Sequence, residues 1–351
     1  MSGTGDVMTI GWGIVGTGRH ADLMMAPAIA AVDDALLAGV VSRDEGRARD
    51  FADRHHAARA YTRYEDLLDD PEVHVVFVAS PNALHAGQAV AAAVAGKHVL
   101  CDKPLATSLD DAVRVTEACR DAGVRLGIDF QTRHAASSRE AQRLISDGAI
   151  GAPLLVQAEH GSGRNPLRGW RTDADMAGLG VVNNIGVHVY DLVAFMLGDQ
   201  PTEVLAMFDV GRTEALETLS MTMLRFSRGA LAYVNANQAV PNRQNDFVIY
   251  GSEGRLVGRN LTRHMQAGEL GVIRGDGAEE RTAYSTHDVY QRVVADMNQA
   301  VLTGREPLAS GLDGLRSVEL TEAVAKSARE GRLVALEYSR AAITTGERGI
   351  L

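Results

Sequence analysis

Short apolar runs alternate with longer amphipathic stretches through the first 130 residues of the chain. The apolar runs predict buried strands at 10–15, 35–41, 73–79, 98–101 and 124–128. The amphipathic stretches between them predict helices at 19–31, 45–56, 82–95 and 109–122. Near-continuous apolar strands that alternate with helices are typical of a parallel sheet covered on both faces. We therefore expect an α/β domain with a doubly wound, Rossmann-type parallel sheet over residues 1–130.

After about residue 150 the pattern changes, and strand-like runs follow one another with few helices between them. These runs lie at 154–160, 203–208, 219–226, 230–238, 247–250 and 255–258. Glycine-containing turns at 227–229 and 251–254 separate two pairs of them. Consecutive strands indicate a large open antiparallel sheet in an α+β domain over residues 131–351. Two final helices, near 287–303 and 312–331, can pack back on the first domain.

Composition limits the classes of partner. The 351 residues include 35 Lys and Arg against 45 Asp and Glu, a net charge of −10, which argues against nucleic acid and anionic membranes. The N-terminus lacks a basic region followed by an apolar core, and no apolar run approaches the roughly 18 residues of a membrane span. Cys101 and Cys119 form neither a disulfide framework nor a metal-ligand cluster. We expect a cytoplasmic protein that needs no metal.

A glycine-rich loop follows the first predicted strand and opens the first helix. A G-x-G-x-x-G pattern falls on Gly11, Gly13 and Gly16, but the residues before Gly16 still belong to the strand. The turn therefore begins at Gly16, in the segment Gly16-Thr17-Gly18-Arg19-His20-Ala21. Its first glycine permits the tight turn, its second lets the backbone approach a pyrophosphate, and its alanine lets helix and strand pack closely. The position of the loop predicts a bound dinucleotide.

The end of the second strand indicates which dinucleotide binds. An acidic residue there would bind the ribose 2′-hydroxyl of NAD, whereas an arginine would accommodate the 2′-phosphate of NADP. Ser42 ends the strand, Arg43 follows it, and Arg47 lies one helical turn further on. A hydroxyl and two guanidinium groups suit a phosphate, so NADP(H) is the preferred cofactor. Asp44 leaves NAD(H) as an alternative cofactor. In a purely structural alternative, Ser42 only caps the next helix.

Three further segments complete the pattern. The strand at 73–79 runs into Ser80-Pro81-Asn82-Ala83-Leu84-His85, and the strand at 98–101 runs into Asp102-Lys103-Pro104. Both lie at carboxyl ends of strands, where ligands bind in open α/β sheets. With the glycine loop and the later segment 180–191, they resemble the glucose–fructose oxidoreductase/inositol dehydrogenase (Gfo/Idh/MocA) family over about residues 8–338. Residues 169–171 and 251–260 are most similar to its NADPH-dependent 1,5-anhydrofructose reductase branch.

The resemblance implies two catalytic residues. The family's Glu-Lys-Pro pattern falls on residues 102–104 and puts Lys103 between the nicotinamide and a substrate hydroxyl. Its Asp-x-x-x-His pair falls on Asn184 and His188, and imidazole is a natural proton carrier near neutral pH. Alone, a lysine before a proline is mostly a surface cation and a lone histidine at a helix start is usually structural. The assignments of both Lys103 and His188 as catalytic residues therefore rest on the neighbouring motifs.

Two residues depart from the family pattern. Asp102 replaces a glutamate and keeps its charge, whereas Asn184 replaces an aspartate and loses it. A carboxylate beside an imidazole favours the imidazolium, and an amide does so much less. We therefore expect His188 to hold a proton less readily and Lys103 to carry more of the proton transfer. Alternatively, substrate choice has moved away from the polyols that an aspartate would bind.

The expected contacts fall into two groups. Cofactor contacts are expected from Gly16, Thr17, Gly18, Arg19, His20, Ser42, Arg43, Arg47, Ser80, Asn82, His85, Asp102 and Lys103. Substrate contacts are expected from Lys103, Gln131, Arg133, Trp170, Arg171, Asn184 and His188. Trp170 would stack on a sugar ring, although an ordinary packing role explains it equally well. His160, His20 and the pair His55–His56 show no metal-ligand spacing and are interpreted as surface or packing residues.

Together these features predict an NADP(H)-dependent enzyme that transfers a hydride to or from a carbinol or carbonyl carbon of a sugar, anhydrosugar or polyol. An NAD-dependent inositol or sugar dehydrogenase, glycoside cleavage assisted by bound nicotinamide, and a cofactor-binding regulator without catalysis are the alternatives. Retention of Lys103 and His188 favours catalysis, because fold alone does not establish function. The outer face of the antiparallel sheet needs cover, which in this family is often provided by dimer or tetramer formation.

Overall fold

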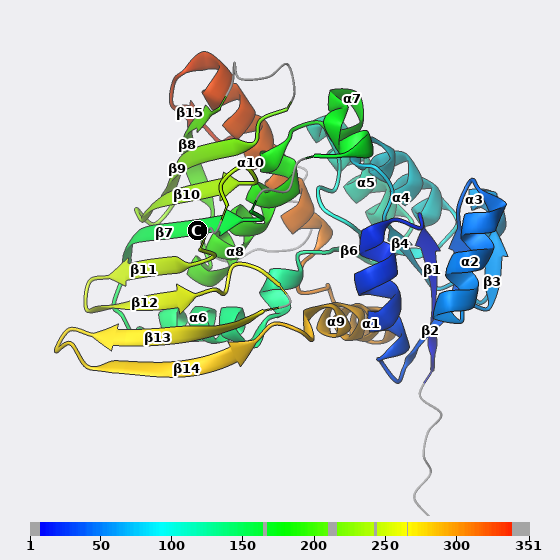
Figure 1. The fold of residues 1–351 in the computed structure, drawn as a ribbon, viewed down its shortest axis with the longest axis horizontal. Coiled ribbons are helices and arrows are strands. Elements are labelled where there is room, and N and C mark those ends of the chain that lie inside the picture. The colour runs from blue at the N-terminus through cyan, green and yellow to red at the C-terminus, as the bar shows by residue number, and fades with distance from the viewer. Residues whose placement is uncertain (1–7, 164–166, 210–215, 242–243, 265, 339–351) are drawn as a thin grey trace, which may run out of the picture. The chain divides into compact units, whose positions relative to one another are not determined.

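The computed structural model describes residues 8–163, 167–209, 216–241, 244–264 and 266–338. The chain forms two compact units (Figure 1). Unit 1 contains Met1–Leu105, Arg114–Asp129 and Tyr290–Gly311, and unit 2 contains Ala106–Val113, Phe130–Val289 and Leu312–Leu351. The division is therefore not a single cut near residue 130, because a late segment of the chain returns to unit 1.

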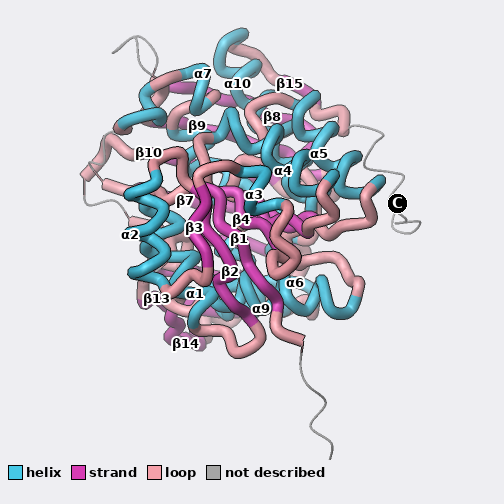
Figure 2. Tube along the Cα trace, turned by 90° about the vertical axis from the view of Figure 1, so that its right-hand side faces the viewer, coloured by secondary structure: helices cyan, strands magenta, loops and turns pink. Residues whose placement is uncertain are grey.

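Unit 1 is built on a six-stranded sheet in which every neighbouring pair is parallel. The strands are β1 (Ile10–Val15), β2 (Ala35–Val41), β3 (Arg59–Tyr61), β4 (Val75–Val78), β5 (His98–Cys101) and β6 (Leu126–Ile128). Their order is β3-β2-β1-β4-β5-β6, and Figure 2 shows the first four side by side. This is the order of a dinucleotide-binding doubly wound sheet, with its switch point between β1 and β4. The predicted fold of this half is confirmed.

The helices of unit 1 follow the predicted alternation. A π-helical turn (Ala21–Met25) leads into α1 (Ala26–Ala30), followed by α2 (Glu45–His55), α3 (Tyr64–Leu68), α4 (His85–Val94), α5 (Leu109–Asp121) and α9 (Val289–Thr303). The first residues of α5 are assigned to unit 2. Helix α9 is tied to β1 by a buried hydrogen bond of 3.0 Å from the Trp12 indole to Asn298 Oδ1. Because a buried indole N–H needs an acceptor, this bond explains why the late helix belongs to unit 1.

Unit 2 is built on a nine-stranded sheet in the order β14-β13-β12-β11-β7-β10-β9-β8-β15 (Figure 1). The strands are β7 (Pro153–Gly161), β8 (Pro201–Phe208), β9 (Leu219–Phe226), β10 (Leu231–Asn237), β11 (Phe247–Gly251), β12 (Gly254–Arg259), β13 (Ala267–Arg274), β14 (Glu279–Ser285) and β15 (Val334–Ala335). All neighbours are antiparallel except β7 and β10, which are parallel. The predicted antiparallel sheet is therefore confirmed, with the correction that it is mixed at its centre.

One face of this sheet carries the core helix of unit 2. The helices are α6 (Ala136–Ser146), α7 (Ala174–Ala177), α8 (Val187–Leu197) and α10 (Gly311–Glu330). Every residue of α8 is buried, and the Tyr190 hydroxyl lies 2.8 Å from Thr222 Oγ1 of β9. The apolar segment Ala174–Leu197 is long enough to cross a membrane, but 89% of its most apolar window is buried inside the protein. This burial identifies it as a core helix.

Candidate active site

The glycine loop turns at the switch point of the parallel sheet. Gly16 has a φ of 101°, and a Cβ at this position would lie 3.0 Å from the Ala79 carbonyl oxygen after β4. The Gly16 amide donates a hydrogen bond of 3.1 Å to the Val41 carbonyl at the end of β2. Both the backbone conformation and the close approach require glycine. The predicted tight turn therefore lies among the carboxyl ends of three strands.

The second glycine leaves the space that a pyrophosphate needs. A Cβ on Gly18 would meet no atom within 4 Å, so its missing side chain serves no packing purpose inside the protein. The Gly18 carbonyl accepts a 2.9 Å hydrogen bond from the Asp22 amide in the first turn of the helix. An open glycine at a helix N-terminus suits a phosphate group. The loop, including half-buried Thr17 and exposed Arg19, thus fits a dinucleotide.

The residues after β2 are those on which the two cofactor hypotheses depend. Ser42 is buried at the strand end, whereas Arg43 and Arg47 are exposed. Asp44 is the N-cap of α2, and its Oδ1 accepts a 2.8 Å hydrogen bond from the Arg47 amide. The Asp44 carboxylate is thus engaged at the helix start, where it stabilises the helix. Two guanidinium groups remain on the surface beside the buried hydroxyl.

The segment after β4 contains His85, one of the predicted cofactor contacts. His85 is fully buried, with Nδ1 2.7 Å from the Pro104 carbonyl oxygen and Nε2 2.9 Å from the Ser80 carbonyl oxygen. Both ring nitrogens therefore face backbone carbonyls, and His85 joins two loops instead of offering a free nitrogen to a cofactor. The Ser80 hydroxyl donates to Gln88 Oε1 at 2.6 Å, and Asn82 is buried. Lys103 is half-buried, and its bond to Pro104 is cis.

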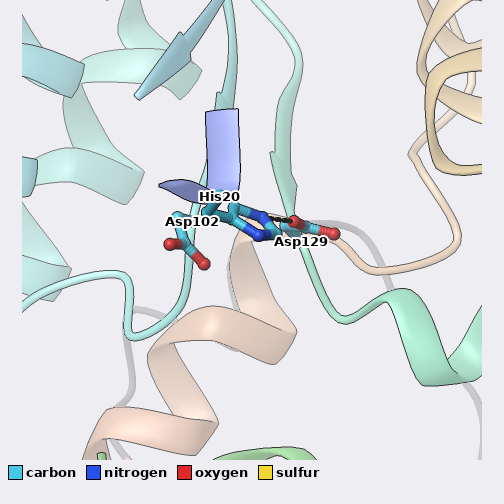
Figure 3. A group of neighbouring side chains, drawn as sticks. All are labelled: His20, Asp102 and Asp129. Carbon is cyan, nitrogen blue, oxygen red and sulfur yellow. Dashed lines mark hydrogen bonds and ion pairs between the residues drawn. The ribbon is translucent and has the colours of Figure 1, made fainter. Parts of the chain in front are cut away.

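An ionisable cluster lies at the carboxyl ends of β5 and β6 (Figure 3). His20 Nε2 lies 2.7 Å from Asp129 Oδ2. A ring nitrogen of His20 and one carboxylate oxygen from each of Asp102 and Asp129 all lie within 4.8 Å of one another. Burial alone would lower the pKa of His20, but the Asp102 carboxylate and the hydrogen bond to Asp129 outweigh it and raise this pKa. Burial raises the pKa of Asp129, against the opposing effect of His20.

The histidine predicted for catalysis lies in unit 2. His188 is in the first turn of α8, and its ring stacks on the His160 ring of β7 with centroids 6.3 Å apart and planes at 16°. Both histidines are buried, so the interpretation of His160 as a packing residue is upheld and a surface position is excluded. Half-buried Asn184 donates a 3.0 Å hydrogen bond to Gln238 Oε1. An amide and a second imidazole therefore adjoin this region of the helix start.

Arg133 is engaged inside unit 2 and does not lie open to a substrate. Its Nε lies 2.9 Å from Asp191 Oδ2, and its Nη2 lies 2.6 Å from Asp191 Oδ1 and 3.0 Å from Asp313 Oδ1. The Arg133 side chain is 8% exposed. A substrate would have to break or share this buried ion pair to contact Arg133. These bonds give Arg133 a structural role, and its role in substrate binding stays a prediction. Buried Gln131 contacts His264 Nδ1 at 3.1 Å.

Trp170 and Arg171 form a pair within a short 3₁₀ turn, Gly169–Thr172. The Arg171 guanidinium carbon lies 4.2 Å from the centre of the Trp170 ring, a cation–π contact. Both side chains are half-buried. The guanidinium thus covers one face of the indole, which leaves at most the other face for the predicted stacking on a sugar.

A separate groove of about 800 Å³ in unit 2 is not part of this chemistry. It lies at the C-terminal ends of α6 and α8, and its charged side chains include Arg143, Arg228 and Asp199. Arg143 pairs with two carboxylates, and Arg228 donates to the Gly198 carbonyl at 2.9 Å and pairs with Asp199. These charges already satisfy one another.

The comparisons with known proteins agree with this architecture. Residues 10–130 match the profile described as "Oxidoreductase family, NAD-binding Rossmann fold", and residues 138–257 match the Gfo/Idh/MocA C-terminal domain. The chain belongs to the Gfo/Idh/MocA family. The family resemblance seen in the sequence is confirmed, and the chain is a nicotinamide-dependent oxidoreductase.

Several relatives of this Gfo/Idh/MocA protein have known activities or structures. It is 33% identical over 330 residues to 1,5-anhydro-D-fructose reductase of Ensifer adhaerens, covering 93% of this chain and 98% of the relative. It is 28% identical to myo-inositol 2-dehydrogenase of Thermotoga maritima, again over 93% and 98%. The structure matches aldose–aldose oxidoreductase from Caulobacter crescentus with a TM-score of 0.87, 29% identity and coverage of 93% and 100%. A 3-ketoreductase from Actinomadura kijaniata in complex with NADP matches at 0.82, with 26% identity and coverage of 91% and 98%.

The sequence reasoning assigned no role to one residue of this family member, Asp129, and left open whether another, His160, is buried. Asp129 directly follows β6, and a carboxylate at the end of a parallel strand is a signal that could have identified it. His160 follows Val156 and Ala158 at a spacing of two on β7, and all three are buried. The alternation of the strand could therefore have placed His160 on the inner face. The roles predicted for Lys103 and His188 stay predictions.

Proposed function

We propose that this chain catalyses NADP(H)-dependent oxidation or reduction at a carbinol or carbonyl carbon of a sugar, anhydrosugar or polyol. The observation that carries the proposal is Lys103, which follows β5 at the same end of the parallel sheet as the open glycine loop. When bound, the dinucleotide supplies or accepts the hydride. In the reductive direction Lys103 gives one N–H proton to the substrate oxygen, and in the oxidative direction it takes that proton back. The family resemblance supports His188 as a second proton-handling residue.

The substrate class rests on the relatives. Their names include a 1,5-anhydro-D-fructose reductase, a myo-inositol 2-dehydrogenase and a D-xylose 1-dehydrogenase that uses NADP(+). All of these act at a carbon that bears a hydroxyl or carbonyl group. The half-buried Trp170 and the Asn184 amide are groups that suit a hydroxylated ring, through stacking and hydrogen bonding. The first candidate substrate is the keto form of an anhydrosugar, which the enzyme would reduce. The reason is that the 33% identity to the reductase exceeds the identity to the inositol and xylose enzymes.

The preference for NADP(H) rests on the residues after β2. Buried Ser42 and exposed Arg43 and Arg47 provide a hydroxyl and two guanidinium groups for a 2′-phosphate. The alternative ligand of a ribose 2′-hydroxyl, Asp44, already accepts a hydrogen bond as the N-cap of α2. Using Asp44 for NAD would compete with that capping interaction.

NADPH is expected to bind at least about tenfold more tightly than NADH, and Arg43→Ala is expected to remove most of this difference. The measurement is a titration that follows reduced-nicotinamide fluorescence. Arg49→Ala is the matched control, because Arg49 is an exposed arginine of α2, the helix that follows Arg43, and it pairs with Glu45. The control should leave NADPH affinity within about twofold of wild type. Equal or tighter binding of NADH to the wild-type chain would overturn the preference and favour an NAD-dependent dehydrogenase.

We also propose that the chain forms a homodimer or homotetramer through the outer face of the nine-stranded sheet. Apolar side chains gather there in paired register: Met221 pairs with Met207 of β8, and Met223 pairs with Tyr233 of β10. Met207, Met221 and Met223 are 70%, 42% and 53% exposed in the single chain. Leu231, which is 45% exposed, continues the patch. A contiguous exposed apolar patch of this kind marks an interaction surface.

Sedimentation of the wild-type chain is therefore expected to give a dimer or a larger assembly. Met223→Lys should shift it toward the monomer, because the interface would then bury a charge without a partner. Val94→Lys is the control, since Val94 is 79% exposed on α4 of unit 1. A wild-type monomer at micromolar concentration would exclude this assembly.

A further inference from the structure

The pair His20–Asp129 holds its acid almost completely buried. The Asp129 side chain is 1% exposed, and the His20 side chain is 24% exposed. Among the described residues, Asp129 Oδ1 is buried and has no hydrogen-bond partner, so Oδ2 and its 2.7 Å bond to His20 are what stabilise the carboxylate. A buried carboxylate is costly unless a cation accompanies it. The pair therefore favours an imidazolium on His20.

Charged groups after β5 and aromatic rings of β4 and α9 face this pair. Asp102 and Lys103 follow β5, and the Asp102 carboxylate raises the pKa of His20 whereas the Lys103 ammonium lowers it. The Tyr290 ring at the start of α9 lies edge-on to His20 with centroids 5.4 Å apart, and the Phe77 ring of β4 lies 5.9 Å away. Burial raises the pKa of Tyr290 well above its ordinary value, so its hydroxyl stays neutral near neutral pH.

The His20 and Asp129 side chains contact each other directly. The direct 2.7 Å bond joins His20 Nε2 to Asp129 Oδ2, the atoms that a cation would need. In Figure 3 the second Asp129 oxygen points away from Asp102. What changes in this cluster near neutral pH is therefore a proton: the pair has a charge of −1 without it and 0 with it.

We propose that His20 and Asp129 determine which redox state of the nicotinamide cofactor this chain prefers, with the protonated pair favouring the reduced form. The inference rests on the proposed function, in which the reacting ring lies beside Lys103. An oxidised nicotinamide ring carries a positive charge, and a reduced ring is neutral. The unprotonated pair, with its charge of −1, attracts the oxidised ring, and only this attraction is lost when the pair gains its proton. Linkage then requires that the oxidised cofactor bind more tightly as the pair loses this proton.

The test is the binding of NADP⁺ and NADPH to the otherwise unliganded protein between pH 6 and pH 8.5, by calorimetry. The Kd of NADP⁺ relative to that of NADPH should fall about fivefold as pH rises, with a midpoint set by His20. In Asp129→Asn the midpoint should move to lower pH, because the imidazolium loses its buried partner. In the double variant His20→Gln/Asp129→Asn the ratio should become independent of pH. Replacing both partners with neutral groups of similar shape limits the cost to folding.

His55→Gln is the matched control, because His55 also contacts a carboxylate, Asp22, at 2.7 Å but lies at the end of α2. Its pH dependence should equal that of wild type. A wild-type ratio that does not change with pH, or a double variant that keeps the wild-type dependence, would overturn the inference while leaving the proposed function standing. Failure of both cofactor forms to bind wild type would overturn the proposed function and this inference with it.

Discussion

Lys103→Met is expected to reduce turnover by about a thousandfold while NADPH affinity stays within a few-fold of wild type. Methionine keeps the length and apolar stem of the side chain but has no proton to give, and general acid–base catalysis typically contributes a factor of 10² to 10⁴. The loss should appear in kcat more than in KM, because the proton moves in the transition state. Steady-state kinetics with a reducible sugar, combined with the fluorescence titration, measures both quantities.

The matched control is Lys326→Met, which removes an exposed lysine from α10 in the same type of substitution. Its turnover should equal that of wild type. Full activity in Lys103→Met would mean that Lys103 is an ordinary surface cation and that another group handles the proton. Loss of NADPH binding together with turnover would instead assign Lys103 to cofactor binding.

Arg133→Met is expected to destabilise unit 2 by about 3 to 5 kcal/mol, because it leaves two carboxylates without the cation that joins them. Arg133 lies between Asp191 and Asp313 with a side chain only 8% exposed. Burial already raises the pKa of Asp191 to about 6, even with Arg133 opposing that rise. Without Arg133 this carboxyl should protonate more readily, which removes the unpaired charge. The destabilisation should therefore be larger at pH 8 than at pH 5.

Urea unfolding at pH 8 and pH 5 measures the free energy of unfolding of Arg133→Met, and Arg143→Met is the comparison. Arg143 also bonds two carboxylates, Glu140 at 2.7 Å and Asp147 at 2.5 Å, but its side chain is 55% exposed. Solvent screens such pairs, so the loss expected for Arg143→Met is much smaller than that for Arg133→Met. Equal losses in the two variants would contradict the assignment of Arg133 to a buried structural network.

The first half of the chain could be predicted well because its signals are local. Strands β1, β2 and β5 have the predicted bounds, since each is a short apolar run buried in a parallel sheet. Strand β3, Arg59–Tyr61, was not predicted, because it is short and largely exposed at the sheet edge. Local apolarity therefore identifies central strands and misses edge strands.

The second half was less predictable for two reasons. Strand β14, Glu279–Ser285, is exposed at nearly every position, so it lacks the alternation that reveals a half-buried strand. The parallel pairing of β7 with β10 joins segments about seventy residues apart in the chain, and turn residues report only on neighbouring strands. Sequence spacing thus predicted that a sheet exists, but not its mixed order.

The candidate site shows the same limit. The glycine loop could be located because its residues are consecutive and follow a strand. The partners of Arg133 lie 58 and 180 positions away, and Asp129 lies 109 positions from His20. No local pattern links such residues. The sequence therefore identified Arg133 and His20 as candidates but did not reveal the carboxylates with which they pair.

The most direct test of the account is transfer of deuterium from NADPH labelled at nicotinamide C4 to a sugar. The wild-type chain would be incubated with each labelled epimer and a panel of keto-forms of anhydrosugars, pentoses and inositols, and the products analysed by mass spectrometry. The account predicts one deuterium on the reduced carbon of at least one product, from one epimer only, and none with Lys103→Met. The account would be contradicted if the protein bound both cofactors but no sugar gained deuterium from labelled NADPH or labelled NADH.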